Sequence, residues 1–400
     1  MKDFSFNCER VKSSHGSGVC DSLADFYSLY RGSMLEWIAS IWDPESGGFY
    51  YSLSAKHADE YDPDIESTGQ AVGVIQDLGL TSDPFILPDP FIGKVVNYLR
   101  ELQDPDGYFY HKKWGKDINT SRRARDLASA KWVIEGYGSS LKYTSAIDRI
   151  STAKSGANAE YKVPEHLKDK ESFLRYLDGL NINENSYSTG QIIAMQAPEI
   201  KAAGLDSVCV DFLNATQKEN GIWESELSYA TANGVLKICH AYNAFGADIP
   251  RFELVVDAIL ETAISKDTPN AIVDVFNPLM GVHYLRNIIK NTGRAERIES
   301  AEKRIAAKAV EIIDLTKNKI SAFRQDSGGF SYLPRGQKRS EFAWSQGVIV
   351  APGLDEADMN ATQLAKATQL LLTEALGLDT GLPYTVDDGP EFFKLLGCKY

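Results

Sequence analysis

The chain has 400 residues, of which 43% are hydrophobic and 24% are charged, and its formal net charge is −13. This composition is typical of a globular protein that can build a sizeable core. The acidic balance, with a pI of about 5.1, argues against duplex nucleic acid or an anionic membrane as the main partner.

No apolar run approaches the roughly 18 residues that a transmembrane helix needs, and the first residues lack the apolar run of a secretory signal. The cysteines are odd in number and show neither CxxC nor Cys/His ligand spacing: Cys8, Cys20, Cys209, Cys239 and Cys398. We therefore expect a cytoplasmic protein with reduced thiols. The sequence predicts no cofactor and leaves a divalent metal open.

Four short stretches resemble one another, because each places glycine and an aromatic residue after acidic or polar residues: 42–51, 102–111, 216–225 and 324–333. Their glycines Gly48, Gly107, Gly221 and Gly328 are 59, 114 and 107 residues apart. These spacings indicate one, two and two copies of a unit of roughly 55 residues. The turns missing from this series are expected near residues 163–170 and 276–281.

Between these turns the chain shows helical spacing of apolar residues, for example over 94–103, 128–138, 234–246 and 361–377. Convincing alternating strands are absent. About two helices fit each unit, so the expected fold is all-α, with about six helical hairpins closed into an α/α toroid. We expect residues 1–20 to be a loose lead-in and residues 21–400 to form one domain.

The phrases LQDPDGYF, TQKENGIW and RQDSGGF resemble the Q-x(2–5)-G-x-W/F repeats of the terpenoid cyclase and protein prenyltransferase superfamily, which is an α/α toroid. Toroids that are similar to these also host glycoside hydrolases and polysaccharide lyases. The resemblance covers most of the chain and implies the scaffold, and it leaves the chemistry to the residues of the site.

The stretch 60–71 contains acidic residues directly before a helix: Glu60, Asp62, Asp64 and Glu66. Acids are favourable near a helix N-terminus, and Ser67-Thr68 is expected to cap the helix. Capping does not require Asp62, Asp64 and Glu66, so they are either solvated capping acids or catalytic carboxylates. Asp64-Ile65-Glu66-Ser67-Thr68 also resembles the DxDDTA motif of class II terpene cyclases, in which Glu66 would hold the place of the proton donor.

In a toroid, the loops before the inner helices open onto one mouth of the central cavity, so residues after each turn are candidates for the site. The first turn is followed by His57, and the second by Trp114, Arg122, Arg123 and Asp126. Arg122 and Arg123 are either a solvated helix face or a fork for an anion. Later segments add Glu184, Tyr187 and Trp344.

This mixture of acids, arginines and aromatic residues suits a polar, anionic saccharide, because rings stack on sugars and carboxylates act as acids and bases. We expect a carbohydrate-active enzyme, a glycoside hydrolase or a lyase. Its predicted catalytic residues are Asp62, Asp64, Glu66, Asp126 and Tyr187, and its predicted substrate contacts are His57, Trp114, Arg122, Arg123, Glu184 and Trp344.

Two alternatives stay open. One is an isoprenoid cyclase or prenyltransferase-like enzyme with Glu66 as proton donor, which requires an apolar cavity that excludes water. The other is a toroid that binds a ligand without catalysis. The expected partner is a small-molecule or oligosaccharide substrate, with no nucleic acid and no membrane, and the sequence gives no oligomeric state.

Overall fold

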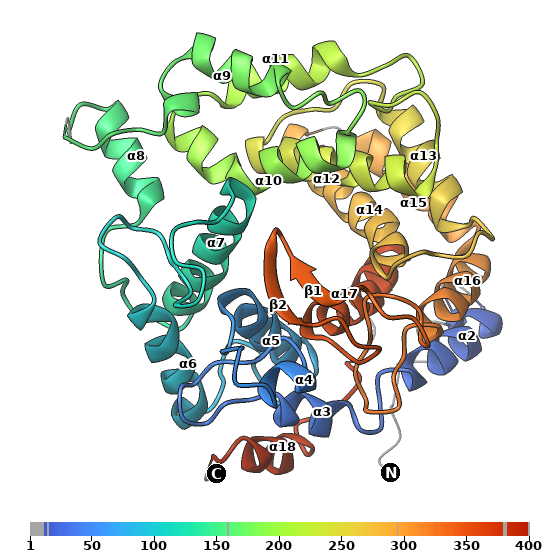
Figure 1. The fold of residues 1–400 in the computed structure, drawn as a ribbon. Helices are drawn as coiled ribbons and strands as arrows, with labels where there is room; N and C mark the ends of the chain where they lie inside the picture. The colour runs from blue at the N-terminus through green and yellow to red at the C-terminus, as the bar shows by residue number, and fades with distance from the viewer. Residues whose placement is uncertain (1–11, 14–15, 158–159, 294, 379–381, 399–400) are drawn as a thin grey trace. The chain divides into compact units, whose positions relative to one another are not determined.

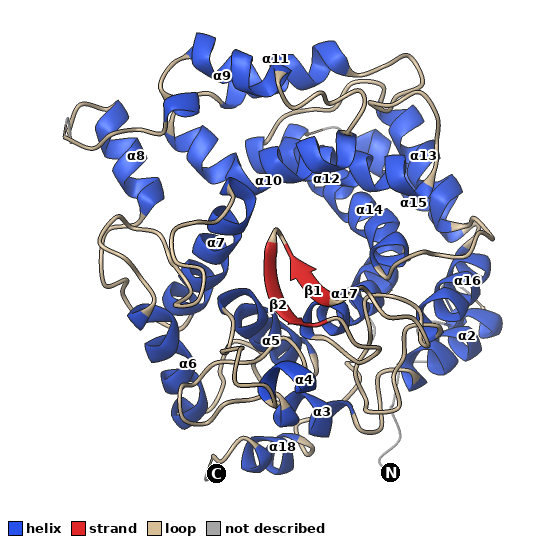
Figure 2. Cartoon of the chain, in the orientation of Figure 1, coloured by secondary structure: helices blue, strands red, loops and turns tan. Residues whose placement is uncertain are grey.

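The computed structural model describes residues 12–13, 16–157, 160–293, 295–378 and 382–398. Over these residues the chain is all-α, as predicted: it has seventeen α-helices, one 3₁₀-helix and a single two-stranded sheet (Figure 2). None of the described helices is long and apolar enough to cross a membrane.

The chain forms two compact units, which we describe separately. The first unit contains residues 1–143, 268–273 and 309–400, and the second contains residues 144–267 and 274–308. The single domain expected over residues 21–400 stays a prediction.

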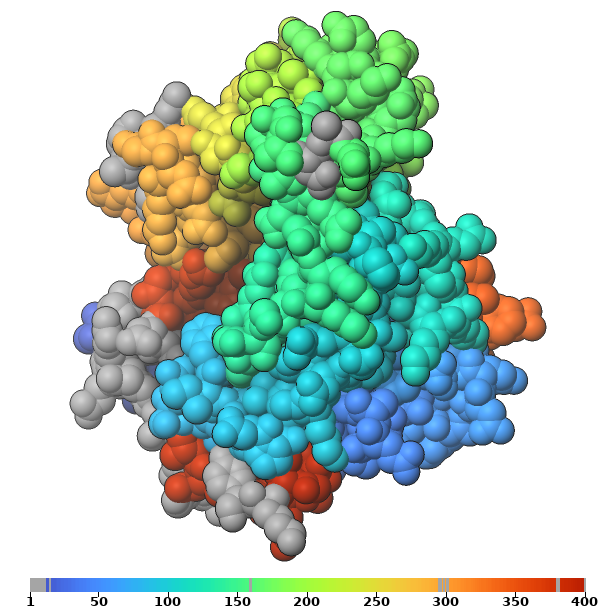
Figure 3. Space-filling view, turned by 90° about the vertical axis from the view of Figure 1, so that its left-hand side faces the viewer, coloured from blue at the N-terminus to red at the C-terminus, as the bar shows by residue number. Residues whose placement is uncertain are grey.

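The first unit consists of helices and one hairpin (Figure 1): α2 Ser17–Ser28, α3 Met34–Ser40, α4 Leu53–Lys56, α5 Ile65–Asp77, α6 Asp89–Glu101, α7 Thr120–Gly136, α16 Ala309–Ser321, β1 Phe342–Ser345, β2 Val348–Pro352, α17 Met359–Ala375 and α18 Gly389–Leu395. Helix α5 packs against both α7 and α17, and α2 packs against α16. On the face drawn in Figure 3, an orange segment from the region of the hairpin lies next to the teal residues before α7.

The contact between α5 and α7 depends on a missing side chain. A Cβ on Gly69 of α5 would lie 2.1 Å from Oγ of Ser129 on α7, and one on Gly73 would lie 3.8 Å from the ring of Trp132. In these two contacts the residue numbers rise together on α5 and α7, so the two helices run parallel. The glycine therefore sets how closely α5 and α7 approach.

The second unit is built from helices alone within its described residues: α8 Ala146–Lys154, the 3₁₀-helix η1 Glu165–Leu167, α9 Lys170–Asp178, α10 Ser186–Ala202, α11 Asp206–Thr216, α12 Tyr229–Phe245, α13 Phe252–Ala263, α14 Val273–Thr292 and α15 Ala295–Ala306. Helices α10 and α12 make its closest helix contact. A Cβ on Gly234 would lie 1.8 Å from Oγ of Ser186, and one on Gly190 would lie 3.1 Å from the backbone nitrogen of Ile238. Helices α10 and α12 are therefore also parallel.

The four glycine turns share one backbone conformation. Gly107, Gly221 and Gly328 have φ values of 94°, 84° and 112°, and in the first turn Gly47 has φ 86°. An L-residue with a side chain rarely adopts this left-handed region. The equivalent glycine of the first turn is therefore Gly47, and the prediction of Gly48 is wrong.

Each turn is closed by a backbone hydrogen bond and followed by a buried aromatic residue. The nitrogens of Asp43, Asp104, Lys218 and Gln325 donate to the carbonyl of the residue after the left-handed glycine, at 2.9–3.0 Å. The residue after this carbonyl is a buried aromatic residue in every turn: Phe49, Phe109, Trp223 and Phe330 are at most 1% exposed. The repeated sequence pattern thus encodes a repeated local structure.

Four details differ from the sequence-based expectations. Residues 276–281, where a turn was expected, lie inside α14, and α2 already begins at Ser17 within the expected lead-in. The hairpin β1–β2 was missed, although its Gln346-Gly347 turn has positive φ at both residues (51° and 87°) and is followed by β-branched residues. Cys20 is disulfide-bonded, so reduced thiols were the wrong expectation there; the thiols of Cys209, Cys239 and Cys398 are free and buried.

The fourth turn offers a test of the repeated conformation. In Gly328→Ala, the new Cβ would lie 2.1 Å from the carbonyl oxygen of Ser33 in addition to the φ of 112°. We expect a loss of about 3 kcal/mol in the free energy of unfolding, measured by urea titration. Gly336→Ala is the matched control, because Gly336 has φ 89° but no atom within 4 Å of its Cβ position. Its loss should be about 1 kcal/mol, and equal losses would contradict the role of the close contact.

Candidate functional site

A single guanidinium organises the candidate site in the first unit. Arg122 is 0% exposed. Its Nη1 donates to Glu66 at 3.0 Å, its Nη2 donates to Asp64, and its Nε lies 3.0 and 3.1 Å from the two carboxylate oxygens of Asp126. The early acids and the later arginine, which are far apart in sequence, therefore meet around one side chain.

Asp64 is both the N-cap of α5 and a partner of Arg122. One of its oxygens accepts from the backbone nitrogen of Ser67 at 3.0 Å and from the Ser67 hydroxyl at 2.8 Å, and the other accepts from Arg122. Ser67 and Thr68 lie inside the first turn of the helix, so the expectation that they form the cap is wrong. Thr68 instead accepts from the backbone nitrogen of Phe49 at 2.9 Å and joins α5 to the first glycine turn.

Arg122 lies in the first turn of α7, where a positive charge is normally unfavourable because the helix dipole is positive at that end. The side chain of Asn119 caps this helix by accepting from the Arg122 backbone nitrogen at 2.8 Å. The three surrounding carboxylates supply the negative charge that the position requires. Because all of the Arg122 nitrogens already face carboxylates, the predicted role of Arg122 as an anion fork is not supported by this geometry.

The carboxylates of the cluster titrate differently. Burial alone would raise the pKa of Asp64, but the charges of Arg122 and His111 and the hydrogen bonds from Ser67 hold it below its usual value. Burial raises the pKa of Asp126 to about 7, and its neighbours Asp64 and Glu66 add to this effect against the attraction of Arg122. The pKa of the Arg122 guanidinium is raised by the three carboxylates, although burial opposes this.

Glu66 connects the buried cluster to half-buried polar groups. One oxygen accepts from Arg125 and, at 3.1 Å, from Gln70; the other accepts from Arg122 and Ser345, both at 3.0 Å. A carboxylate offers about four lone-pair positions in total. All of them are occupied, so a proton can bind Glu66 only after one of these partners is displaced.

The groups around Glu66 come from four elements and include one acceptor that needs a donor. The amide nitrogen of Gln70 on α5 donates to Glu66 and to Asn360 on α17 at 3.0 Å, whereas its Oε1 is buried and has no partner among the described residues. The side chain of Arg125 on α7 is 22% exposed. A buried acceptor without a partner is costly, so this position suits a water or a ligand hydroxyl.

The hairpin β1–β2 holds one side of this site. Ser345 donates to Glu66, and the turn residue Gln346 accepts from Asn119 at 2.7 Å and from Ser121 at 3.0 Å. Trp344 is 49% exposed. Because side chains alternate along a strand, Trp344 points to the opposite face of the hairpin from Ser345, and it does not join the groups around Glu66.

Trp114 is also not available as an open platform. Its ring stacks on His111 with centroids 3.9 Å apart and lies 5.3 Å from the guanidinium carbon of Arg122. The ring also packs against the hydrophobic cluster under the hairpin. Trp114 therefore helps to cover Arg122, and its predicted contact with a sugar stays a prediction.

The remaining predicted residues lie elsewhere. His57 and Asp62 are exposed, and Arg123 lies over the ring of Tyr108 at 4.6 Å. Glu184 and Tyr187 belong to the second unit, where Glu184 is exposed and Tyr187 contacts Lys237 through its ring at 5.8 Å. Within the described residues of the first unit, His57, Asp62 and Arg123 are not among the hydrogen-bond or ion-pair partners of Arg122 and Glu66.

Sequence reasoning missed three residues at Glu66: Gln70, Ser345 and Asn360. A signal for two of them existed, because IESTGQ and MNATQ are similar sequences at the starts of α5 and α17, and Gln70 and Asn360 lie in them. Ser345 required the hairpin, which was not predicted. Among the described residues, no three His, Cys, Asp or Glu side chains gather as metal ligands.

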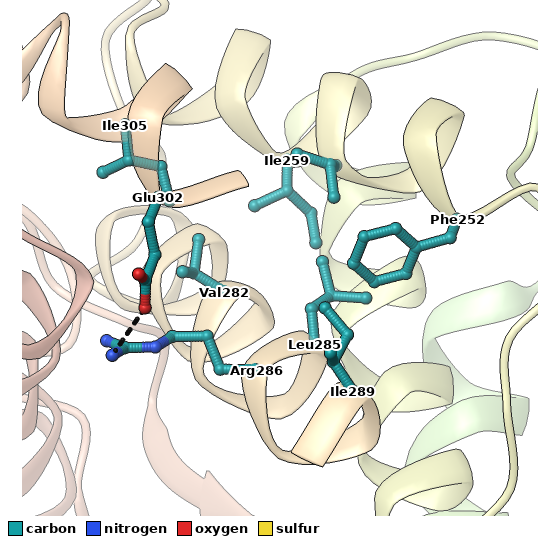
Figure 4. Close-up of a pocket in the computed structure, with 9 residues that line it drawn as sticks. Phe252, Ile259, Val282, Leu285, Arg286, Ile289, Glu302 and Ile305 are labelled. Carbon is teal, nitrogen blue, oxygen red and sulfur yellow. Dashed lines mark ion pairs between the residues drawn. The ribbon is translucent and has the colours of Figure 1, made fainter. Parts of the chain in front are cut away.

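An apolar pocket lies in the second unit, between α13, α14 and α15 (Figure 4). Phe252, Ile259 and Leu285 are among the residues that line it, and Arg286 forms an ion pair with Glu302 at 3.1 Å beside it. Its cavity volume is about 10 Å³. This is room for about one water molecule, so the pocket does not accommodate an isoprenoid chain in this structure.

No family model matches the chain, and no curated protein matches it. Membership in the terpenoid cyclase and prenyltransferase superfamily stays a prediction from the glycine turns.

Replacement of Arg122 tests whether its fork holds the cluster. We expect Arg122→Lys to lose about 3 kcal/mol in the free energy of unfolding, since an ammonium cannot serve three carboxylates at once. Urea titration measures this loss, and Arg123→Lys on the same helix is the control. An effect of the control size, within about 0.5 kcal/mol, would contradict the central role of Arg122.

Asp126 predicts a pH dependence of stability. Because its pKa is raised to about 7 in the folded protein, its stabilising contribution is complete below the unfolded pKa and is lost as the pH rises through 7. Asp126→Asn removes this titration. The stability of the wild type relative to the variant should therefore fall between pH 5 and pH 8, by about 3 kcal/mol at most. Thermal unfolding at both pH values measures it, and Glu135→Gln, an exposed change on α7, should show no such trend.

Proposed function

We propose that the protein is a carbohydrate-active enzyme that acts on a polar, anionic saccharide, and that Glu66 is its catalytic carboxylate. One observation carries this proposal: Glu66 is the member of the buried cluster that also contacts the half-buried groups Arg125, Gln70 and Ser345. All three carboxylates are buried, with Glu66 4% exposed and Asp64 and Asp126 at most 2% exposed. Asp64 and Asp126 hold Arg122, so we assign them as positioning residues. The proposed site thus presents both charged and hydrogen-bonding groups to a ligand.

We also propose that the helical hairpins close into an α/α toroid. The repeated glycine turns support this arrangement, and so do the parallel neighbours α5 and α7 in the first unit and α10 and α12 in the second. In the first unit, α5 contacts a neighbour on each side, α7 and α17, as the inner helices of a ring do.

In the proposed reaction, a carboxylate of the saccharide replaces Glu66 as the partner of Arg125. Guanidinium groups bind carboxylates in a planar, two-point geometry. The exchange frees one acceptor position on the Glu66 oxygen that Gln70 also contacts, while Arg122 and Ser345 hold the other oxygen. A ligand hydroxyl donates to Oε1 of Gln70, the acceptor that has no partner among the described residues.

Between the two reaction types, these groups favour elimination from a uronate. The released oxygen of Glu66 takes the proton from the carbon next to the uronate carboxylate, and the C–H electrons form the ring double bond. The bond between the next ring carbon and the glycosidic oxygen breaks, and the leaving oxygen takes its proton from water. Glu66 then returns its proton to the resulting hydroxide, which completes the cycle. Arg125 stabilises the charge that develops on the carboxylate. Hydrolysis needs a second carboxyl about 5–10 Å away that also reaches the glycosidic bond. The neighbouring carboxylates Asp64 and Asp126 are at most 2% exposed and are held by Arg122.

The isoprenoid alternative has less support. A carbocation needs an apolar surrounding that excludes water. The contacts of Glu66 are guanidinium, amide and hydroxyl groups. The non-catalytic alternative is an outcome of the experiment below.

The purified protein is incubated with a panel of acidic oligosaccharides, neutral oligosaccharides and prenyl diphosphates. Elimination is read as ultraviolet absorbance of the new double bond together with new reducing ends. We expect turnover of a uronate-containing oligosaccharide only. Glu66→Gln should lower kcat at least about a hundredfold, as expected for the loss of a general base.

Arg125→Lys should mainly raise KM for the uronate substrate, about tenfold, because it keeps the charge and loses the two-point geometry. Arg123→Lys is the matched control on the same helix and should leave both constants unchanged. Reducing ends without the absorbance would identify a hydrolase instead. Binding of acidic saccharides without turnover would identify a non-catalytic module, and turnover of a prenyl diphosphate would overturn the proposal.

A further inference from the structure

The second unit contains a hollow that is separate from the residues around Glu66. Its volume is about 160 Å³, and it lies between the start of α12 and the end of α13; its lining consists of Leu227, Ser228, Tyr229, Glu261, Thr262, Ser265 and Asp267. On the scale used for the apolar pocket, where about 10 Å³ is room for one water molecule, this hollow is large enough for a small organic ligand. A single sugar ring or a small amino alcohol is in this range.

The lining of the hollow carries negative charge and hydroxyl groups. Glu261 and Asp267 are exposed and able to reach a ligand, and no lysine, arginine or histidine lines the hollow. Glu261 lies in the last turn of α13, whose carbonyl end is the negative pole of the helix dipole. Two carboxylates and a helix C-terminus together favour a cation.

The start of α12, on the other side of the hollow, is the positive pole of that helix, and local hydrogen bonds already partly satisfy its N–H groups. The hydroxyl of Ser228 accepts from the backbone nitrogen of Thr231 at 3.2 Å, and the Thr231 hydroxyl accepts from the Ser228 nitrogen at 2.7 Å. This capping box occupies two of the backbone N–H groups at the start of α12 and so weakens its attraction for an anion.

Asp267 is held in place by its neighbours. The hydroxyl of Ser265 donates to its carboxylate at 2.9 Å and accepts from its backbone nitrogen at 3.1 Å, and the Tyr229 hydroxyl donates to its carbonyl at 3.4 Å. Burial raises the pKa of Tyr229 to about 12, so its phenol keeps its proton. One carboxylate oxygen of Asp267 is thus oriented, which reduces the entropy lost on binding.

We propose that this hollow is a binding site for a small polyhydroxylated amine, such as an amino sugar. The ammonium would pair with Glu261 and Asp267, and the ligand hydroxyls would exchange hydrogen bonds with Ser228, Thr262 and Tyr229. A metal ion is a poorer occupant, because no three His, Cys, Asp or Glu side chains gather within the described residues. The hollow lies wholly in the second unit, so ligand binding there does not depend on the proposed role of Glu66.

Calorimetric titration of the whole protein with D-glucosamine, D-glucose and D-glucuronate tests the site at pH 7. We expect glucosamine to bind at least about tenfold more tightly than glucose, the usual effect of a charged hydrogen bond, and glucuronate not to bind. Glu261→Gln and Asp267→Asn should each weaken glucosamine about tenfold without affecting the unfolding transition. Glu226→Gln is the control, because Glu226 is exposed nearby and does not line the hollow.

The outcomes separate clearly. Equal binding of glucose and glucosamine would overturn the role of the carboxylates, and tighter binding of glucuronate would overturn the assigned charge of the ligand. Glucosamine binding that persists in the Glu261→Gln/Asp267→Asn double variant would place the ligand elsewhere. Loss of glucosamine binding in Glu66→Gln would contradict the independence of the two sites.

Discussion

The structure of the first unit depends on the burial of one guanidinium among three carboxylates. Arg122 is fully buried, and each of its partners comes from a helix start or from one turn further along α7. Removing such a charge from water costs several kcal/mol unless its hydrogen-bonding groups are satisfied. The fork geometry of arginine meets this condition, so the ends of α5 and α7 are fixed relative to each other at this point.

Glu66 is the residue of this cluster on which the proposed function depends. It shares Arg122 with Asp64 and Asp126, yet it also accepts from Arg125, Gln70 and Ser345, which lie in α7, α5 and the hairpin. A carboxylate in such a position is oriented before a ligand arrives, and catalysis depends on this kind of preorganisation. Arg122 and Ser345 fix one oxygen of Glu66. The other oxygen, which bonds to Arg125, is therefore the one that a substrate can free.

Much of the scaffold could be predicted from local chemistry. The turns with glycine and a buried ring recur because a left-handed residue needs glycine and the ring that follows needs a core. The exact glycine of the first turn was misassigned, since Gly47 and Gly48 are adjacent and only the backbone conformation distinguishes them. The hairpin was missed because its pattern is short and β1 is half exposed.

The sequence by itself determined the helical class, the repeated turns and the idea that Asp64, Glu66 and Arg122 belong together. Only the tertiary structure decided that Arg122 is saturated by carboxylates, that Trp114 covers it, and that Gln70, Ser345 and Asn360 complete the surroundings of Glu66. The physical reason is that turns and caps are set by neighbours in the chain. Burial and the partner of each charge depend on residues up to about 300 positions away, such as Gln70 and Asn360.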